Sequence, residues 1–366
     1  MAGSGFGTNL RITTWGETHG AGVGVVVDGC PAGLPLERED VQKYLDRRKP
    51  GQSKYTTQRK EGDQVEILSG IFEGRTTGTP ISMVVYNKDQ RSKDYSNIKD
   101  IYRPGHADFT FDMKYGFRDY RGGGRSSGRE TIGRVAAGAV AAKVLKELGI
   151  EIKAYAKAIA GIEVSKDHFD LVEMNNNPFN MPDKEAAKLV QEKADQMIKE
   201  MDSIGGIIEC QITGMPVGIG ETVFDKLDAE LSKAIMSIGS VKGFEIGDGF
   251  EAANLRGSEN NDDFICVDGK VAKETNHSGG VLGGMSDGST IVFRAAIKPT
   301  PSIAQTQKTV NRDLDNVEIE IHGRHDPMIV PRAVVVVESM AAVTILDGVL
   351  KNLGATMDNI KKIYGE

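Results

Sequence analysis

The stretch GRSSGRETIGRVAAGAVAAKVLKELG (124–149) carries the clearest helix signal in the chain. Ser127 and Glu130 have the S-x-x-E spacing of a capping box, and Gly149 is the residue type that commonly ends a helix. Together these signals predict one long helix over residues 128–148. Its apolar positions recur at helical spacing, and they are Ile132, Val135, Ala136, Ala139, Val140 and Val144. Because alanine lies on this apolar face, we expect close packing against another element.

A second stretch, GRHDPMIVPRAVVVVESMAAVTILDGVLKNLG (323–354), repeats this pattern. Both begin with Gly-Arg and two polar residues, contain a second arginine, and continue into an alanine- and valine-rich helix closed by glycine. A pseudo-twofold axis between them would bring Arg125 and Arg324 to equivalent positions, each at the start of a helix. A single site between the two halves would then be natural.

The segment VVVDGCPAGLPLEREDVQKYL (25–45) likewise resembles IECQITGMPVGIGETVFDKLDAELSKAI (208–235), and the order of the segments is the same in both halves. We interpret this as an internal duplication, in which residues 8–150 and 205–355 are the repeats of one large domain, 1–366. Strands that precede helices without strict β-α-β alternation favour an α+β fold. The other predicted elements are strands at 10–14, 23–29, 64–70 and 80–87 and helices at 36–49 and 183–201.

The composition, with 366 residues that are 39% hydrophobic and 27% charged, allows a large buried core. A net charge of -7 argues against nucleic acid as the main partner, so local basic segments indicate a small anion instead. The three cysteines lie far apart and suggest neither a zinc knuckle nor a disulfide framework. The first residues lack the apolar core of a signal peptide, and no run approaches 18 apolar residues. We therefore expect a cytoplasmic protein that binds neither nucleic acid nor a membrane.

Three consecutive glycines, 122–124, precede the predicted helix at 128–148, and Arg125, Arg129 and Arg134 follow them. A helix N-terminus offers free backbone N–H groups and a partial positive charge, and arginine adds forked donors. This combination predicts an anion site that binds a phosphate or a flavin. The alternative is a solvated basic loop. Arg48 and Lys298, in two further basic loops, are additional candidates for phosphate contacts.

Two histidines lie in glycine-containing loops, His19 in WGETHGAGVGV (15–25) and His106 in YRPGHADFT (102–110). His325 and Asp326 follow Arg324 in the second repeat. Imidazole titrates near neutral pH, which suits general acid–base chemistry beside an anion. The alternatives are a histidine satisfied within its own turn, or a metal site. No local pair has the spacing of metal ligands, so we expect no metal.

Five of these segments, in their order along the chain, resemble the chorismate synthase family: GETHGAGVGVVVDGCP, RPGHAD, YRGGGRSSGRE, NHSGGVLGG and GRHDP. The resemblance extends over essentially the whole chain. It implies a lyase that catalyses the last step of the shikimate pathway, the 1,4-anti-elimination of phosphate from 5-enolpyruvylshikimate-3-phosphate to give chorismate. It also implies a requirement for reduced FMN without net redox change, an α-β-β-α layered sandwich, and a homotetramer.

The resemblance also implies roles for individual residues. His19 would protonate the leaving phosphate, His106 would stabilise the reduced flavin, and Asp326 would lie near flavin N5. Substrate or NADP would be bound by Arg48, Lys54, Arg129 and Arg134. Flavin contacts would fall on Arg125, Ser126, Ser127, Gly239, Ser240, Gly283, Lys298, Pro299, Thr300, Pro301, Ser302 and Arg324.

The chain departs from the family pattern at several of these positions. Thr18 stands where serine is usual, and Lys54 stands where arginine is more frequent, which removes forked hydrogen bonding. Gly239 and Ser240 replace an Asn-Ala or Pro-Ala pair. These departures make the expected contacts at Lys54 and Gly239 the least secure of the set.

Two rival functions remain open from the sequence. One is a flavin-dependent oxidoreductase that consumes NADPH stoichiometrically. The other is a protein that binds phosphorylated anions without catalysis. Under the elimination reading, NADPH acts only as an indirect reductant. Because no reductase domain is visible, an external flavin reductase would supply the reduced FMN.

Overall fold

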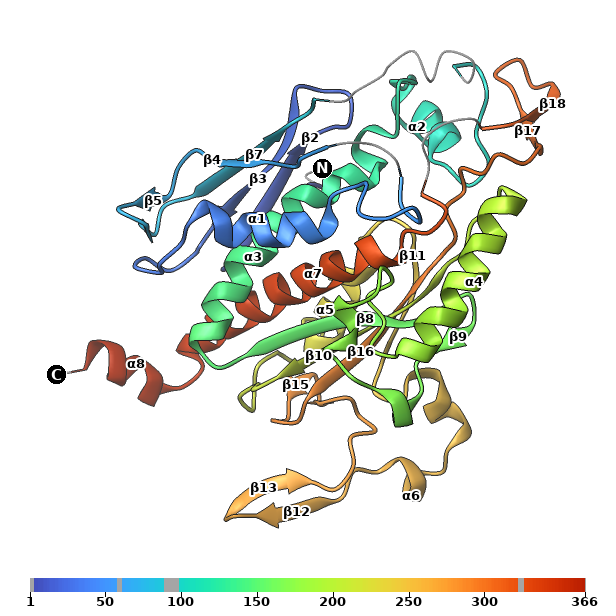
Figure 1. Ribbon diagram of the computed structural model, residues 1–366. Helices are drawn as coiled ribbons and strands as arrows, with labels where there is room; N and C mark the ends of the chain where they lie inside the picture. The colour runs from blue at the N-terminus through green and yellow to red at the C-terminus, as the bar shows by residue number, and fades with distance from the viewer. Residues whose placement is uncertain (1–2, 58–60, 89–98, 322–325, 366) are drawn as a thin grey trace.

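The computed structural model describes residues 3–57, 61–88, 99–321 and 326–365 (Figure 1). Arg324 and His325 lie outside these described residues. The fold is α+β in one domain, as predicted. Two five-stranded sheets enclose a central set of helices.

The first sheet has the strand order β1-β2-β3-β7-β4, and every pairing in it is antiparallel. The four predicted strands form as β2 (Arg11–Gly16), β3 (Gly22–Asp28), β4 (Val65–Ile67) and β7 (Ile81–Tyr86). A short strand that was not predicted, β1 (Gly5–Phe6), pairs with β2 at the edge. In β2, Ile12 and Thr14 are buried whereas Arg11 and Thr13 are exposed. This alternation fits a strand with one face towards the core.

The second sheet has the order β11-β16-β10-β8-β9 and is also antiparallel throughout. Its strands are β8 (Glu151–Ile159), β9 (Ile162–Glu163), β10 (Gly206–Thr213), β11 (Val241–Ile246) and β16 (Ile291–Ile297). Residues 8–150 therefore supply four strands of the first sheet, β1 lies just before them, and residues 205–355 supply three strands of the second. The strands β8 and β9 come from the segment between the two. An origin by duplication stays a prediction.

Two long helices, α3 (Thr131–Glu147) and α7 (Val330–Lys351), pack against each other between the sheets. On its other side α3 contacts β3, and α7 contacts β8 and β10. A Cβ atom on Gly138 would lie 2.2 Å from the Ser339 Cβ, so this glycine permits the close approach of the two helices. Shorter helices extend the layer on both sides, α1 (Arg38–Arg48) and α5 (Leu227–Met236).

The layers therefore run sheet, helix, helix, sheet, and the α-β-β-α order that we expected from the resemblance is not the observed one. The reason lies in the composition of the helices. Sixteen of the 22 residues of α7 are buried, so it is apolar on most of its circumference. A helix of this kind must be covered on all sides, whereas an outer helix needs only one apolar stripe.

By length and composition α7 is also the one described helix apolar enough to cross a membrane. In this fold 78% of the relevant segment is buried inside the protein. Its apolar surface is thus used by the domain core.

Both central helices begin at the same end of the domain. Arg48, the last residue of α1, donates from Nη1 to Thr131 Oγ1 at the start of α3 (3.3 Å). Arg332, on the first turn of α7, donates from Nε to the carbonyl oxygen of Arg48 (3.0 Å). The structure thus brings two helix N-termini together, as the repeated sequence pattern predicted.

The start of α3 differs in detail from the prediction. Residues Gly128–Glu130 form a short 3₁₀ turn, and α3 begins at Thr131. The Ser127 hydroxyl accepts a hydrogen bond from the Arg129 N–H (3.3 Å), whereas the Glu130 carboxylate pairs with Arg134 instead of returning to Ser127. The predicted capping box is therefore replaced by a cap on the 3₁₀ turn.

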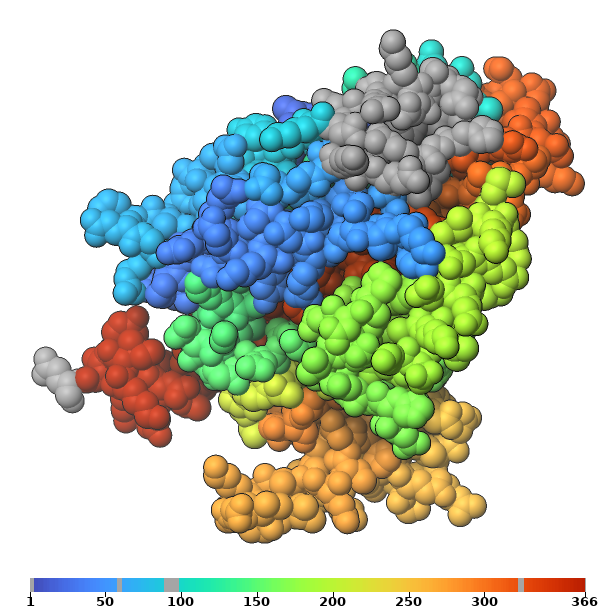
Figure 2. All heavy atoms as spheres, viewed as in Figure 1, coloured from blue at the N-terminus to red at the C-terminus, as the bar shows by residue number. Residues whose placement is uncertain are grey.

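The remaining helices are α2 (Asp108–Tyr115), α4 (Lys184–Glu200), α6 (Gly257–Asn260) and α8 (Met357–Tyr364). Two-stranded sheets are formed by β5 (Ile71–Phe72) with β6 (Arg75–Thr76), β12 (Phe264–Val267) with β13 (Lys270–Lys273), β14 (Val281–Leu282) with β15 (Met285–Ser286), and β17 (Gln307–Val310) with β18 (Asn316–Ile319). The predicted cover helix forms as α4. Figure 2 shows that α8 and the β12–β13 hairpin project from the body of the domain.

Candidate functional site

The candidate site lies where α3 and α7 begin, and Asp63 is at its centre. The Asp63 carboxylate accepts from Arg48 Nη2 at 2.6 Å through Oδ2 and from Arg129 Nη1 at 2.9 Å through Oδ1. All three side chains are buried. Burial alone would raise the pKa of Asp63, but the two guanidinium groups outweigh it and hold that pKa below its ordinary value. The carboxylate is therefore ionised and bridges two cations.

Arg48 and Arg129 retain donors that nothing satisfies among the described residues. A guanidinium has five N–H groups. Arg48 Nε is buried without a hydrogen-bond partner, and so is Arg129 Nη2, which lies 3.6 Å from Glu61 Oε2. Buried polar groups are normally hydrogen-bonded, so two such donors on arginines that share the Asp63 carboxylate indicate a place for an external acceptor.

Asp326 belongs to the same cluster. It accepts from the Thr57 N–H (2.8 Å) and from Arg332 Nη1 (2.7 Å). Burial lowers the pKa of Arg332, whereas the neighbouring Asp326 acts in the opposite direction. We call Arg48, Arg129, Arg332, Asp63 and Asp326 the arginine cluster.

The turn that contains His19 is joined to the arginine cluster through Asn87. The Asn87 side chain accepts from Arg129 Nε (2.5 Å) and donates to the Gly20 carbonyl oxygen (2.9 Å). The His19 ring lies directly against Gly122, because a Cβ atom there would be 2.6 Å from His19 Cδ2. The triple glycine thus lets the loop before α3 close onto the histidine turn.

Arg125 holds that loop in place. Its guanidinium donates to the Gly16 carbonyl oxygen (3.1 Å) and to Thr14 Oγ1 (2.7 Å) at the end of β2. Thr18, the departure from the family pattern, is buried and its hydroxyl lies 3.4 Å from the Gly124 carbonyl oxygen. The serines behave differently, since Ser126 is exposed and Ser127 is used as a cap.

His106 lies against the segment that follows β16. Its Nε2 is 2.8 Å from Ser302 Oγ, and its Nδ1 is 2.9 Å from the Pro104 carbonyl oxygen. A carbonyl oxygen can only accept, so Nδ1 carries a proton and a neutral ring would accept from Ser302 at Nε2. Burial, reinforced by Arg103, lowers the pKa of His106. The free site therefore favours the neutral imidazole.

The loop of His106 is fixed on both sides. Arg103 forms a forked pair with Asp108 at 2.7 Å to each carboxylate oxygen. Lys298 Nζ donates to the carbonyl oxygen of Gly105 (3.0 Å), whose positive φ of 69° suits glycine. His106, Lys298 and Ser302, predicted from distant parts of the chain, are thus brought together.

This second group is connected to the arginine cluster through the segment just before β10. The Ser203 hydroxyl donates to the Thr300 carbonyl oxygen (2.7 Å), and the next N–H, that of Ile204, donates to the Pro327 carbonyl oxygen (3.0 Å) beside Asp326. Pro299 is exposed, and Pro301 packs over Gly105. The backbone carbonyl oxygen of Ser240 accepts a hydrogen bond from the Lys298 N–H (2.9 Å), and the neighbouring Gly239 is exposed.

Three other predicted residues, Arg134, Lys54 and Gly283, lie outside the two groups described above. The Arg134 guanidinium donates from Nε to Glu130 Oε1 (2.9 Å) and from Nη1 to Ser237 Oγ (2.6 Å), directly after α5. Lys54 is mostly exposed and pairs with Asp195 of α4 (2.8 Å). Gly283 lies in the β14–β15 turn, whose Gly284 carbonyl oxygen accepts from Leu227 at the start of α5.

Gly283 is consequently separated by the length of α5 from Ser240, another predicted flavin residue. Ser240 follows the end of α5, whereas Gly284 contacts its beginning. The ten residues of α5 separate these points by about 15 Å.

Sequence reasoning missed Asp63, Asn87 and Arg332. Asp63 follows a basic loop, and the two acids Glu61 and Asp63 directly after several cations are the signal that could have drawn attention to it. Asn87 had no local signal, because its partner Arg129 is 42 residues away along the chain. Arg332 lies six residues after Asp326, its ion-pair partner, but its other partner, Arg48, is 284 residues away.

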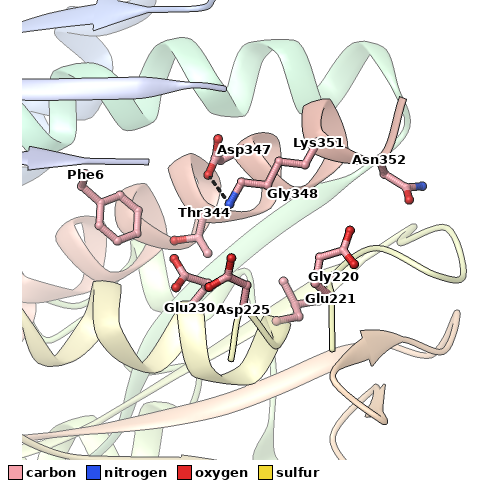
Figure 3. A pocket seen from close by; sticks show the side chains of 11 residues that line it. Phe6, Gly220, Glu221, Asp225, Glu230, Thr344, Asp347, Gly348, Lys351 and Asn352 are labelled. Atoms are coloured by element: carbon pink, nitrogen blue, oxygen red, sulfur yellow. Dashed lines mark ion pairs between the residues drawn. The ribbon is translucent and has the colours of Figure 1, made fainter. Parts of the chain in front are cut away.

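A well-formed cavity lies at the other end of α7 and is acidic (Figure 3). We call it the acidic pocket, and its lining includes Phe6, Asp225, Glu230, Asp347 and Lys351. Asp347 accepts from the N–H groups of Thr8, Asn9 and Leu10 and pairs with Lys351. A lining dominated by carboxylates would repel a phosphorylated substrate, so this cavity is not the candidate site.

Comparison with known proteins gives one consistent result. The family model described as chorismate synthase matches residues 10–350. A chorismate synthase of Lachnospira eligens is 67% identical over 364 residues, which cover 100% of both chains. A chorismate synthase of Methanosarcina mazei is 56% identical over 355 residues, which cover 96% of this chain and 97% of the relative. A crystal structure of a chorismate synthase superposes with a TM-score of 0.77 at 31% identity, over 98% of this chain and 96% of that one.

Proposed function

Because the chain belongs to the chorismate synthase family, we propose that it converts 5-enolpyruvylshikimate-3-phosphate to chorismate. The reaction is an anti 1,4-elimination of phosphate that requires reduced FMN without net redox change. The protein is thereby a lyase of the shikimate pathway. We further propose that it works in the cytoplasm as a homotetramer and receives reduced FMN from an external flavin reductase.

The observation that carries the proposal is the pair of unsatisfied donors on Arg48 and Arg129. Both guanidinium groups are buried and fixed by Asp63, and they lie where two helix N-termini meet. An oxyanion that gains charge in the transition state is stabilised best by donors already in position. A leaving phosphate, or the ring carboxylate of the substrate, provides such an acceptor.

His19 is proposed as the acid that gives a proton to the departing phosphate. Its turn is joined through Asn87 to Arg129, so the backbone that carries the histidine and the Arg129 guanidinium belong to one hydrogen-bonded unit. Neutralising the phosphate as its bond breaks lowers the cost of separating it from the ring. Arg134, held by Glu130 and Ser237, would complete the anion contacts at the rim.

The second group of residues fits a planar anionic cofactor. His106, Lys298 and Ser302 offer an imidazole, an ammonium and a hydroxyl from one fixed loop pair, and the Thr300 hydroxyl is buried without a partner among the described residues. These residues would hold FMN together with Arg125. When bound, the reduced flavin supplies the electron density and the proton acceptor that the elimination needs.

His106 has a defined part in this proposal. The pKa of His106 is lowered in the free site, so the ring is neutral before ligand binds. An anionic group placed beside it favours the charged imidazole and raises the pKa again. His106 would thus take up a proton with the reduced flavin and balance its charge. Asp326, fixed by Arg332 and the Thr57 N–H, is proposed to lie close to N5 of the bound flavin.

The decisive experiment is anaerobic phosphate release from 5-enolpyruvylshikimate-3-phosphate with dithionite-reduced FMN. We expect many turnovers from one charge of reduced flavin, with chorismate formed in equal amount to phosphate. Consumption of one NADPH per turnover would favour the oxidoreductase instead. Tight binding of the substrate with no phosphate released would favour a non-catalytic anion-binding protein.

A further inference from the structure

The inference concerns Asp63, to which the proposed function gives no role. A carboxylate repels an anionic substrate, so Asp63 is not expected to bind the substrate directly. It is buried completely at its side chain, between two arginines from different elements. Arg48 ends α1, and Arg129 lies in the 3₁₀ turn before α3. Each arginine takes a separate oxygen, at 2.6 and 2.9 Å. One carboxylate thus sets the separation of two cations.

We propose that Asp63 is a positioning residue that fixes Arg48 and Arg129 so that Arg48 Nε and Arg129 Nη2 are presented together to the anionic groups of the substrate. This inference rests on the function proposed above. It assigns to Asp63 the arrangement of the two binding groups and not contact with the substrate.

The remaining contacts of the two arginines show why one orientation results. Arg48 directs Nη1 to the Gly128 carbonyl oxygen (3.1 Å) and Nη2 to Asp63, which leaves Nε. Arg129 directs Nε to Asn87 and Nη1 to Asp63, which leaves Nη2 without a hydrogen bond, with only the longer ion pair to Glu61 Oε2 at 3.6 Å. Because a guanidinium is planar, two fixed nitrogens also fix the third. Asp63 is the only one of these partners that both arginines share.

The backbone at Asp63 is held in an unusual conformation for this purpose. Its φ is +43°, in the left-handed region that residues with a side chain seldom adopt. Gln42 on α1 stabilises it, since its Nε2 donates to the Asp63 carbonyl oxygen (3.2 Å) and its Oε1 accepts from the Val65 N–H (3.1 Å). The helix that supplies Arg48 therefore also holds the backbone of Asp63.

The charge balance separates positioning from attraction. Without Asp63, two buried guanidinium groups would repel each other and could rotate apart, yet the site would attract an anion more strongly. A change of Asp63 to asparagine should therefore lower kcat far more than it raises KM. A misplacement of about 1 Å can reduce the rate about 100-fold, which is the loss that we expect in kcat, with KM within about threefold of the parent.

The matched control is Glu338→Gln. Glu338 is a buried carboxylate of α7 that binds Arg47, the neighbour of Arg48 on α1, at 2.6 and 3.0 Å. It also accepts from the Ala154 N–H, so its loss should lower thermal stability about as much as the loss of Asp63. It has no contact with Arg48 or Arg129. We expect Glu338→Gln to lower Tm while its kcat stays within about twofold of the parent.

Asp63→Glu serves as the second variant and covers the case in which Asp63→Asn does not fold. Glutamate restores the charge and the ion pairs but displaces both arginines by one methylene group. If Asp63 positions the arginines, Asp63→Glu recovers Tm while kcat remains at least about tenfold reduced. If Asp63 matters only for stability, Asp63→Glu recovers both, and that result would overturn the inference.

Three further outcomes are informative. Equal losses of kcat in Asp63→Asn and Glu338→Gln at equal Tm would overturn the inference, because the effect would then follow stability. A rise in KM without loss of kcat in Asp63→Asn would also overturn it. If the unmodified protein releases no phosphate from 5-enolpyruvylshikimate-3-phosphate with reduced FMN, the proposed function fails before Asp63 is tested.

Discussion

The arginine cluster and the acidic pocket lie at opposite ends of α7, and both gather several charged side chains. In the acidic pocket the Asp347 carboxylate accepts three backbone N–H groups and pairs with Lys351, so its hydrogen-bonding capacity is used within the chain. In the arginine cluster, two buried guanidinium groups retain donors without partners among the described residues. The difference teaches that buried donors without an acceptor mark the place for a ligand better than charge or cavity shape alone.

Replacement of His19 should give the largest loss of kcat, and it tests whether the region around the arginine cluster is the catalytic site. We expect His19→Ala to lower kcat by about 10²- to 10⁴-fold, the usual contribution of a general acid, while equilibrium binding of the substrate changes little. Stopped-flow phosphate release and binding calorimetry would measure the two quantities. His277→Ala is the control, because His277 pairs with Asp248 (2.7 Å) in a region away from both helix starts. A kcat within about threefold of the parent would remove the acid role from His19.

Asp347→Asn tests the acidic pocket. We expect it to lower the stability of the protein and to leave kcat unchanged. Asparagine cannot pair with Lys351 as a charge and weakens the hydrogen bonds from Thr8, Asn9 and Leu10. Hydrogen bonds to charged groups contribute about 1.5–3 kcal/mol, so we expect the free energy of unfolding to fall by about 2 kcal/mol. Urea denaturation would measure it. A large loss of kcat in a variant that remains folded would contradict the structural role that we give to the acidic pocket.

Acid should destabilise the arginine cluster through Asp63. The pKa of Asp63 in the folded protein lies below its ordinary value near 3.9, so the folded state favours the ionised form. The stability that this ionised form contributes is fully present above that ordinary value and is lost as the pH falls through the lower, folded-state pKa. The free energy of unfolding of the parent should therefore decline more steeply below about pH 4 than that of Asp63→Asn. Parallel declines in the two proteins would show that Asp63 is not the titrating group.

The sequence predicted those parts of the molecule that depend on local pattern. The helix over 128–148 appears as a 3₁₀ turn followed by α3, and the strands at 10–14, 23–29, 64–70 and 80–87 appear in the first sheet. The layer order could not be read in this way, because it depends on which helix faces remain uncovered after the sheets form. The apolar circumference of α7 was visible in the sequence as a run of valine and alanine, and it is the feature that places the helices inside.

The site was predictable only in part for a similar reason. Arg48, Arg129, His19 and His106 lie in segments with a recognisable local character. Asp63 and Arg332 have meaning only through partners that the fold brings from other segments. The resemblance named the residues expected to touch ligands, whereas the residues that hold them in place became visible from distances alone.

Lys54 provides the smallest expected effect and the sharpest test of that distinction. The resemblance assigns it to substrate or NADP, but the structure places its ammonium 2.8 Å from Asp195 on α4 with most of its side chain exposed. Exposed ion pairs contribute little, so Lys54→Ala should change kcat/KM by less than about threefold. Asp195→Ala is the matched control, because it removes the same ion pair and leaves the ammonium in place. If Lys54→Ala alone raised KM tenfold or more, the loop of residues 50–57 would have to turn towards the arginine cluster on binding, and the contact with α4 would be a feature of the free protein only.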